Sequence, residues 1–347
     1  MEYYVGLDVS LKQTAICVVD GDCGVVWQGC ADTHPEMILS ALDRWVGKIA
    51  RLGLETGSIT PWLARALKAR GLPVIVMDAR RASDAMKARP VKTDRADARA
   101  LAEMLQAGWY WEVYLKSEES HRRKALLSAR DQLVRNKRSF FGQIRGMLRP
   151  PRKQIGGIRL GGRMGTSKFD QAARAATRHD DILYLSVNAL LEALAAIESQ
   201  IAVLDKAVRR LCDRSEACWR LMTVPGVGPI TALAFEAAIE DPARFRRSRD
   251  VGAYLGLTPR RYQSGDRDVS GAISKQGDAM ARHCLYEAAN CLLTTWAGRS
   301  ALKSWGLKLV KRVGPKKARV AVARKLACLL LRLWKDNAPY EGDLRTA

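Results

Sequence analysis

The chain has 347 residues, 48% of them hydrophobic, and a formal net charge of +22 at pH 7. This length predicts about two domains, and the hydrophobic share excludes a disordered chain. The positive charge indicates a polyanionic partner. Nucleic acid is favoured over an acidic membrane surface, because no uninterrupted apolar run reaches the roughly 18 residues of a spanning helix.

The first 112 residues are predicted to form one domain. Strands are expected at 2–8, 13–19, 25–30, 51–57 and 73–77, and helices at 35–50, at 61–70 and directly after the last strand. DGDCG, between the second and third strands, is a hairpin-turn signal. Three strands followed by alternating helices and strands predict a mixed α/β sheet with helices.

Residues 113–215 are predicted to form a basic helical arm. Apolar residues recur at helical spacing over 118–150 and 181–213. The segment 149–168, rich in Pro and Gly, is expected to be a linker or loop. The second helix would pair with the first as an antiparallel arm, or with another subunit as a coiled coil.

Residues 216–347 are predicted to be mostly helical up to about 336. LMTVPGVGPI, at 221–230, puts Gly-Val-Gly between two helical patterns. This is typical of a helix–hairpin–helix module that meets a phosphate, and equally of a plain turn between helices. The stretch 251–258 predicts a short helix or packed turn, and 259–278 a polar loop with glycines.

Positive charge is concentrated in two segments. Residues 121–170 carry 14 Lys and Arg against two acids, and residues 299–326 carry 10 with no acid. We expect both segments to follow nucleic-acid backbones. Such binding is steep in salt, since about 6–10 phosphate contacts lose on the order of 10³–10⁵ in affinity between 50 and 200 mM.

The cysteines and the N-terminus indicate a cytoplasmic protein. The eight cysteines form no CxxC pair and there are four histidines, which argues against a zinc site and for reduced thiols. MEYYVGLDVS, at the N-terminus, lacks the basic and apolar segments of a signal peptide. We therefore expect no membrane partner.

Four carboxylates are placed where functional groups gather. Asp8 and Glu55 each end a predicted strand, and ends of adjacent strands lie side by side in an α/β sheet. Asp94 and Asp97 lie near a helix start, with Thr93 as the expected N-cap. Their i, i+3 spacing puts them on one helix face.

Two interpretations of these carboxylates stay open. Mg²⁺ takes hard oxygen ligands, and four carboxylates would hold one or two such ions for phosphoryl transfer. Alternatively, Asp94 and Asp97 simply complement the positive end of the helix dipole, beside Lys92, Arg95 and Arg99.

A serine in RYQSGDRDVSG is the candidate nucleophile. Ser264 precedes a glycine and follows Arg260 and Arg261, which could hold an anion while the hydroxyl attacks a phosphodiester. Ser270 and Ser274 are equally placed by composition, and an ordinary surface-loop serine is the plainer interpretation.

Several stretches together resemble one family. In chain order they are GLD (6–8), LETG (54–57), KTDRADARALAE (92–103), VPGVGPITA (224–232), YLGLTPRRYQSG (254–265) and SKQGDAMARHCLYEAA (274–289). Their combination is similar to the DEDD-type transposases of bacterial insertion sequences, the insertion-sequence one-ten family. The resemblance spans about residues 6 to 295.

The resemblance implies roles for both sets of residues. The N-terminal domain would be RuvC-like (RNase H-type), with Asp8, Glu55, Asp94 and Asp97 as the acidic tetrad that binds Mg²⁺. The C-terminal transposase domain would use Ser264, rather than Ser270 or Ser274, to form a covalent 5′-phosphoserine.

The resemblance also implies the partners. They are donor and target DNA, a structured guide RNA that pairs with both, and further copies of the chain in a homodimer or tetramer. In RNA-guided systems base pairing determines the sequence that is bound. The chain is thus expected to be a cytoplasmic bacterial enzyme.

Two other functions remain as alternatives. A metal-dependent RuvC-like junction nuclease would use water as nucleophile, so it would leave free ends and would not need Ser264. A non-catalytic RNA- or DNA-binding protein would retain its function after Asp8→Asn. The acidic pair in a basic chain argues against the latter, because those acids would weaken binding.

Overall fold

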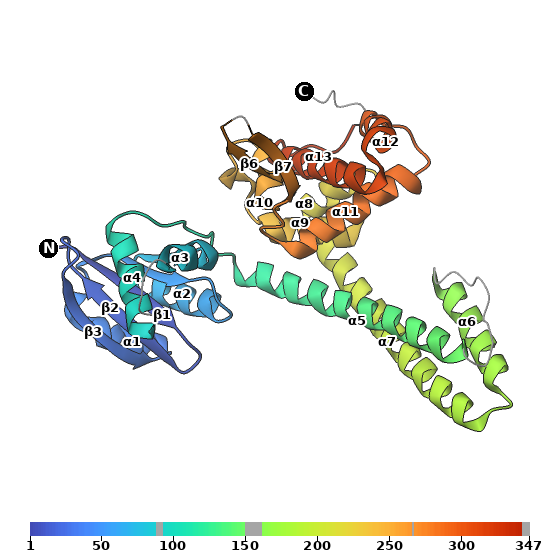
Figure 1. Ribbon diagram of the computed structural model, residues 1–347, viewed down its shortest axis with the longest axis horizontal. Helices are drawn as coiled ribbons and strands as arrows, with labels where there is room; N and C mark the ends of the chain where they lie inside the picture. Colours follow the sequence, from blue (N-terminus) through green and yellow to red (C-terminus); the bar gives the residue numbers. More distant parts are fainter. Residues whose placement is uncertain (88–92, 150–161, 266, 342–347) are drawn as a thin grey trace. The chain divides into compact units, whose positions relative to one another are not determined.

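The computed structural model describes residues 1–87, 93–149, 162–265 and 267–341. By compactness the chain divides into two units, Met1–Ser117 and Glu118–Ala347 (Figure 1). The division of the second unit into an arm and a C-terminal domain stays a prediction.

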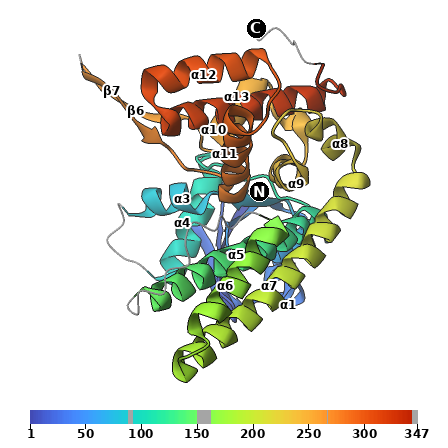
Figure 2. The ribbon, with the colours of Figure 1, turned by 90° about the vertical axis from the view of Figure 1, so that its right-hand side faces the viewer.

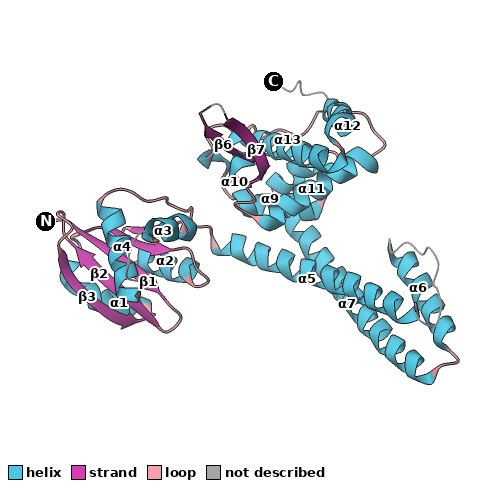
Figure 3. Cartoon of the chain, viewed as in Figure 1, coloured by secondary structure: helices cyan, strands magenta, loops and turns pink. Residues whose placement is uncertain are grey.

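The first unit contains a five-stranded mixed sheet (Figure 3). Its strands are β1 (Tyr3–Val9), β2 (Gln13–Val19), β3 (Val25–Asp32), β4 (Ile49–Glu55) and β5 (Val74–Met77), in the order β3-β2-β1-β4-β5. β2 runs antiparallel to β1 and β3, whereas β4 runs parallel to β1 and β5. The predicted mixed α/β sheet is confirmed, and its order is consistent with an RNase H-like domain.

Helices cover both faces of this sheet. They are α1 (Pro35–Leu42), the 3₁₀ turn η1 (Asp43–Trp45), α2 (Thr60–Ala69), α3 (Ala79–Met86) and α4 (Asp94–Gln106). Apolar side chains of α1 and α2 pack with Val5, Leu7 and Ile16, while Ala98 and Ala102 of α4 pack with the alternate residues of β2.

The predicted helix over 35–50 is wrong in its second half. The α-helix ends at Leu42, and β4 already begins at Ile49. Between them Gly47 has φ +84°, a left-handed conformation that ends helices readily.

The second unit begins with three helices, α5 (Glu118–Leu148), α6 (Gly162–Thr177) and α7 (Asp181–Asp213). α5 and α7 lie side by side in both views (Figure 2). Arg130 of α5 forms an ion pair with Asp205 of α7 at 2.5 Å, and Lys137 pairs with Glu198. The predicted antiparallel pairing of 181–213 with the first helix of the arm is therefore confirmed. Pairing with another subunit stays a prediction.

The predicted linker over 149–168 is wrong from residue 162 on, because α6 begins at Gly162. Residues 150–161 lie outside the described part of the chain. Phe169 of α6 packs edge-on against Phe141 of α5, with ring centroids 4.8 Å apart. Tertiary packing thus stabilises a helix in a glycine-bearing sequence.

By length and composition α7 could cross a membrane, but a single such helix among the described residues is weak evidence for a membrane span. Its ion pairs through Glu198 and Asp205 tie it to α5 instead. We therefore interpret α7 as half of the helical arm.

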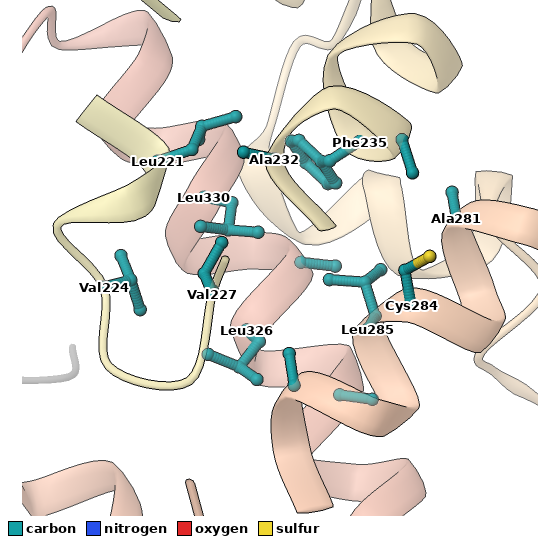
Figure 4. Packing of buried hydrophobic residues seen from close by; sticks show 14 of the residues in the cluster. Leu221, Val224, Val227, Ala232, Phe235, Ala281, Cys284, Leu285, Leu326 and Leu330 are labelled. Atoms are coloured by element: carbon teal, nitrogen blue, oxygen red, sulfur yellow. The ribbon is translucent and has the colours of Figure 1, made fainter. Parts of the chain in front are cut away.

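The rest of the second unit is a helical body with one hairpin. It comprises α8 (Glu216–Met222), α9 (Pro229–Ile239), η2 (Pro242–Arg244), η3 (Ser248–Asp250), α10 (Val251–Tyr254), β6 (Pro259–Ser264), β7 (Arg267–Ile273), α11 (Ala279–Thr294), α12 (Ala301–Val313) and α13 (Pro315–Lys335). Buried residues of α8, α9, α11 and α13 meet in one core, including Leu221, Phe235, Leu285 and Leu330 (Figure 4).

The GVG turn joins α8 to α9, and its central Val227 and the preceding Val224 are both buried in that core. Gly226 has φ +85° and lies so close to the Ala288 carbonyl of α11 that a Cβ would not fit. The side of the turn that carries Gly226 therefore packs against α11 and the core of the helical body.

Two ion pairs attach α5 to the helical body. Arg123 lies 2.7 Å from the carboxylate of Glu236 on α9, and Lys124 lies 2.5 Å from that of Asp278 before α11. Glu236 is nearly buried and also accepts from the Ser215 hydroxyl at 2.7 Å. A buried, multiply bonded carboxylate makes this attachment costly to break.

The predicted loop over 259–278 is wrong up to residue 273, because β6 and β7 form an antiparallel hairpin, and it is confirmed over 274–278. All six residues of β6 are exposed, so the segment shows no apolar alternation that would predict a strand. We refer to residues 259–273 as the serine hairpin.

Candidate active site

Asp8 and Glu55 lie at the carboxyl ends of neighbouring parallel strands. Leu7 of β1 pairs with Leu54 of β4, which brings the next residue of each strand to the same edge of the sheet. The Thr60 hydroxyl donates to the Glu55 carbonyl at 2.6 Å, and Thr56 donates its N–H to Met77 of β5. These bonds fix the backbone around Glu55.

α4 brings Asp97 to the same edge. The predicted cap is confirmed, since the Thr93 hydroxyl accepts from the Ala96 N–H at 3.2 Å. Gly6 of β1 lets α4 approach the sheet, because a Cβ there would overlap the Ala98 carbonyl. Asp97 is half-buried, whereas Asp94, at the first helical position, is exposed.

The environment of Glu55 disfavours its ionised form. Its pKa is raised to about 7, first by burial and then by the negative charges of Asp8, Asp97 and Asp78. Its Oε1 is buried and has no hydrogen-bond partner in the described chain. Asp94 is not among the groups that raise this pKa. The structure thus brings Asp8, Glu55 and Asp97 into electrostatic range, and we call these three the carboxylate edge.

The carboxylate edge has the donor type that a hard cation prefers, but its side chains are not gathered into a metal site. Among the described residues no three His, Cys, Asp or Glu side chains are close enough together to hold a metal ion. All its donors are hard carboxylate oxygens, and a bound cation would both satisfy Glu55 Oε1 and lower the pKa of Glu55.

Asp78 was not predicted as a site residue from the sequence, but its negative charge also raises the pKa of Glu55. It directly follows β5, and its carboxylate accepts from the N–H groups of Arg80 and Arg81 at the start of α3. Its position at the end of a strand could have marked it in the sequence as a candidate site residue. Its hydrogen bonds to Arg80 and Arg81 show that it is the N-cap of α3.

The serine hairpin places Ser264 at the end of β6. Ser264 pairs with Arg267 of β7, and Tyr262 pairs with Val269. Directly opposite residues of an antiparallel pair point to the same face. Ser264, Tyr262, Arg267 and Val269 therefore share one face, and Tyr262 is 62% exposed. Gly265, after Ser264, has φ +54°, which suits a tight turn.

Arg261 lies on the opposite face of the hairpin. It forms two hydrogen bonds with Asp268, at 2.9 and 2.6 Å, and this pair lowers the pKa of Asp268. Arg260 donates to the Ser274 carbonyl at 3.4 Å. The cation that faces Ser264 across the hairpin is thus Arg267, which the sequence analysis missed because a strand register was not expected there.

The structure also separates the three serines. Ser270 pairs with Arg261 and so points to the face away from Ser264. Ser274 follows β7, where its backbone N–H donates to Thr258 and its hydroxyl accepts from Gln276. Ser264 alone of the three shares a face with Arg267.

Comparisons with known proteins identify the class. The profile of a DEDD transposase family of IS110 type matches residues 5–150, and that of the transposase IS116/IS110/IS902 family matches residues 218–304. The chain therefore belongs to the IS110-type family of insertion-sequence transposases. The resemblance predicted from the motifs is confirmed. Family membership implies an activity that cuts and rejoins DNA, and the DEDD domain implies a divalent metal ion.

Individual relatives agree with this assignment. The transposase of insertion sequence IS1111A from Coxiella burnetii is 30% identical over 290 residues, 82% of this chain and 77% of that protein. A probable family 20 transposase of Pseudomonas aeruginosa is 28% identical, covering 72% of this chain and 74% of its own. The IS1328 transposase of Yersinia enterocolitica is 27% identical, covering 68% and 70%.

Proposed function

We propose that this transposase transfers DNA strands through a covalent phosphoserine at Ser264. The observation that carries the proposal is the strand register, which pairs the exposed Ser264 directly with Arg267 on one face of the hairpin. A guanidinium placed there would hold the phosphate under attack and stabilise its developing negative charge.

The proposed step is a phosphodiester exchange. The Oγ of Ser264 forms a bond to phosphorus while the bond from phosphorus to the 3′ oxygen breaks. The Oγ proton passes to a base, and the departing 3′ oxygen takes up a proton to become a hydroxyl. The 5′ end remains linked to Ser264, and attack by a 3′ hydroxyl of another strand reverses the step and joins donor to target DNA.

Asp8, Glu55, Asp94 and Asp97 would hold Mg²⁺ in a RuvC-like domain. The orphaned Glu55 Oε1 and the raised pKa of Glu55 support a cation at this edge. When bound, Mg²⁺ would neutralise phosphate charge. The residues themselves would supply carboxylate oxygens and hold the cation against the sheet.

A structured guide RNA and further copies of the chain are the proposed partners. The basic residues of 121–170 and 299–326 support a polyanion of this kind. Apolar side chains of the arm stand in solvent, among them Ile182, 82% exposed, and Leu185, 71% exposed. Such side chains on α7 support association of two chains as a homodimer, or of four as a tetramer.

The decisive experiment uses end-labelled DNA carrying the element's own ends, with guide RNA and Mg²⁺. Wild type should give a covalent protein–DNA adduct that survives denaturation, and Ser264→Ala should give none. Ser270→Ala is the matched control on the opposite face and should retain the adduct. An adduct formed by Ser264→Ala would exclude Ser264 as the nucleophile.

A metal-dependent nuclease that uses water is the second candidate. It is favoured by one observation: Glu55, with its pKa near 7, lies in a unit that does not contain Ser264 and could accept a proton from water. This function predicts free cut ends, which Ser264→Ala retains and Asp94→Asn loses.

A further inference from the structure

A groove of about 970 Å³ lies in the helical body beside the serine hairpin. Its walls come from α12, from α13 and from the base of the hairpin, including Pro259 and Ile273. Apolar side chains such as Leu302, Trp305 and Leu329 line it. These elements belong to the same compact unit, so the groove is formed within one body.

The groove is strongly cationic. Its basic lining residues are Arg249, Lys316, Lys317, Arg324, Lys325 and Arg332, and no acidic residue lines it. The Lys325 ammonium lies 4.2 Å from the centre of the Trp305 ring. Arg332 is already paired with Asp336 at 3.3 Å, and the other five like charges repel each other unless an anion lies among them. Their arrangement is complementary to a phosphate backbone.

The combination of an indole ring with surrounding cations favours single-stranded over double-stranded nucleic acid. A duplex turns its bases inward, so it would contact the cations but leave the apolar surface uncovered. A single strand offers both parts, since its phosphates meet Lys and Arg while an unstacked base lies on an aromatic ring. The groove lining carries few groups able to identify a base, so we expect little sequence preference.

We propose that this groove binds single-stranded DNA, with an unstacked base against Trp305. The location rests on the proposed function of Ser264. Pro259, in the groove wall, lies five residues before Ser264, which is about 17 Å along an extended strand. At about 3.4 Å per nucleotide, DNA held at Ser264 would enter the groove within about five nucleotides of the cut. The groove would hold the strand that cleavage has freed from its complement.

The test measures binding by fluorescence anisotropy, with the full chain in EDTA so that no cutting occurs. The probes are a fluorescein-labelled 12-nucleotide single strand and a duplex of the same sequence. Trp305→Leu should weaken single-strand binding about tenfold and leave duplex binding unchanged, because stacking contributes only to the former. Trp305→Phe should retain most of the affinity.

A matched pair of double variants separates the groove from general charge. Lys316→Gln with Lys317→Gln should reduce the salt slope of single-strand binding by about 1.4, since each contact contributes about 0.7. Lys308→Gln with Lys311→Gln changes the charge equally on α12, outside the groove lining, and should reduce it much less. Both pairs are exposed, so the comparison remains valid even if Trp305→Leu fails to fold.

Three results would overturn the proposal. They are equal losses in the two double variants, unchanged single-strand affinity in folded Trp305→Leu, or a Trp305→Leu protein that loses self-association but not DNA binding. The last would identify the groove as an interface between copies. Because binding needs no cleavage, loss of the adduct in Ser264→Ala is a separate outcome. If Ser264→Ala retains the adduct while the groove variants behave as expected, only the location relative to Ser264 fails.

Discussion

The side chains around Glu55 are held beneath a helix that packs on the sheet, whereas those around Ser264 stand in solvent on a two-stranded hairpin. The carboxylate edge is fixed before any ligand arrives, and the cost appears as a raised pKa of Glu55. The serine hairpin is held locally by strand pairing and by the pair between Arg261 and Asp268. The difference suits the proposed functions, because metal ligands need fixed positions and a nucleophilic serine needs access to a large substrate.

The largest effect is expected from the two arginines that the hairpin separates. Arg267→Gln should lower the rate of adduct formation by about 10²–10³, since it removes a charged donor from the face of Ser264. Arg261→Gln makes the same chemical change on the opposite face and should cost far less. Single-turnover adduct formation, followed on denaturing gels, measures both. Equal losses would contradict the assignment of faces.

Rigid packing at the carboxylate edge predicts a large loss of stability from one methyl group. Gly6→Ala should lower the free energy of unfolding by about 3 kcal/mol, because the Cβ would overlap the Ala98 carbonyl and push α4 from the sheet. Urea unfolding of the full chain measures it. Gly21→Ala, where nothing lies within 4 Å, should change stability by less than about 0.5 kcal/mol.

Glu55 should make stability depend on pH. Its pKa is about 7 in the folded chain against 4.5 ordinarily, so the folded state binds the extra proton between these values. Without metal, stability should therefore fall as pH rises from about 4.5 to 7. Glu55→Gln should remove this fall and be more stable than wild type at pH 8 by about 2 kcal/mol, allowing for solvent screening.

Urea unfolding at several pH values in EDTA checks this expectation, and Mg²⁺ provides the control. Added Mg²⁺ should stabilise wild type at pH 8 more than it stabilises Glu55→Gln, because binding to the folded state alone raises stability. A wild-type protein whose stability rises over the same pH range would contradict the strained state of Glu55.

The smallest effect is expected at the exposed ion pair. Asp268→Asn removes the partner of Arg261 but leaves the strand pairing and the opposite face intact. Exposed pairs contribute little to stability, so the thermal midpoint should not move measurably. Adduct formation should stay within about twofold of wild type, because Arg261 points away from Ser264. A large loss would mean that the pair shapes the catalytic face.

The first unit was largely predictable from sequence, because β1, β2, β4 and β5 bury apolar runs that stand out, and a turn signal marks the exposed β3. Thr93 and the two aspartates after it gave the start of α4 correctly. The close approach of α4 at Gly6 was not predictable, since it depends on which residues of helix and sheet meet.

The hairpin was not predictable for the opposite reason. Its strands bury almost nothing, so no hydrophobic alternation marks them. Without a register, Arg260 and Arg261 seemed the natural neighbours of Ser264 because they are close in sequence. Strand pairing assigns that position to Arg267, which follows the turn. Motif matching selected Ser264 as the candidate nucleophile, but only the register shows that Arg267 is paired with it.

The attachment of α5 through Arg123 and Lys124 has a mechanical consequence. These two ion pairs clamp the first turns of a 31-residue helix to α9 and to the start of α11. Such a helix is about 46 Å long, so a rotation of about 10° at the clamp moves its far end by about 8 Å. A rotation of α5 would therefore pivot about its attachment to the buried carboxylate of Glu236. Small adjustments of the helical body would be amplified at the distant tip of the arm.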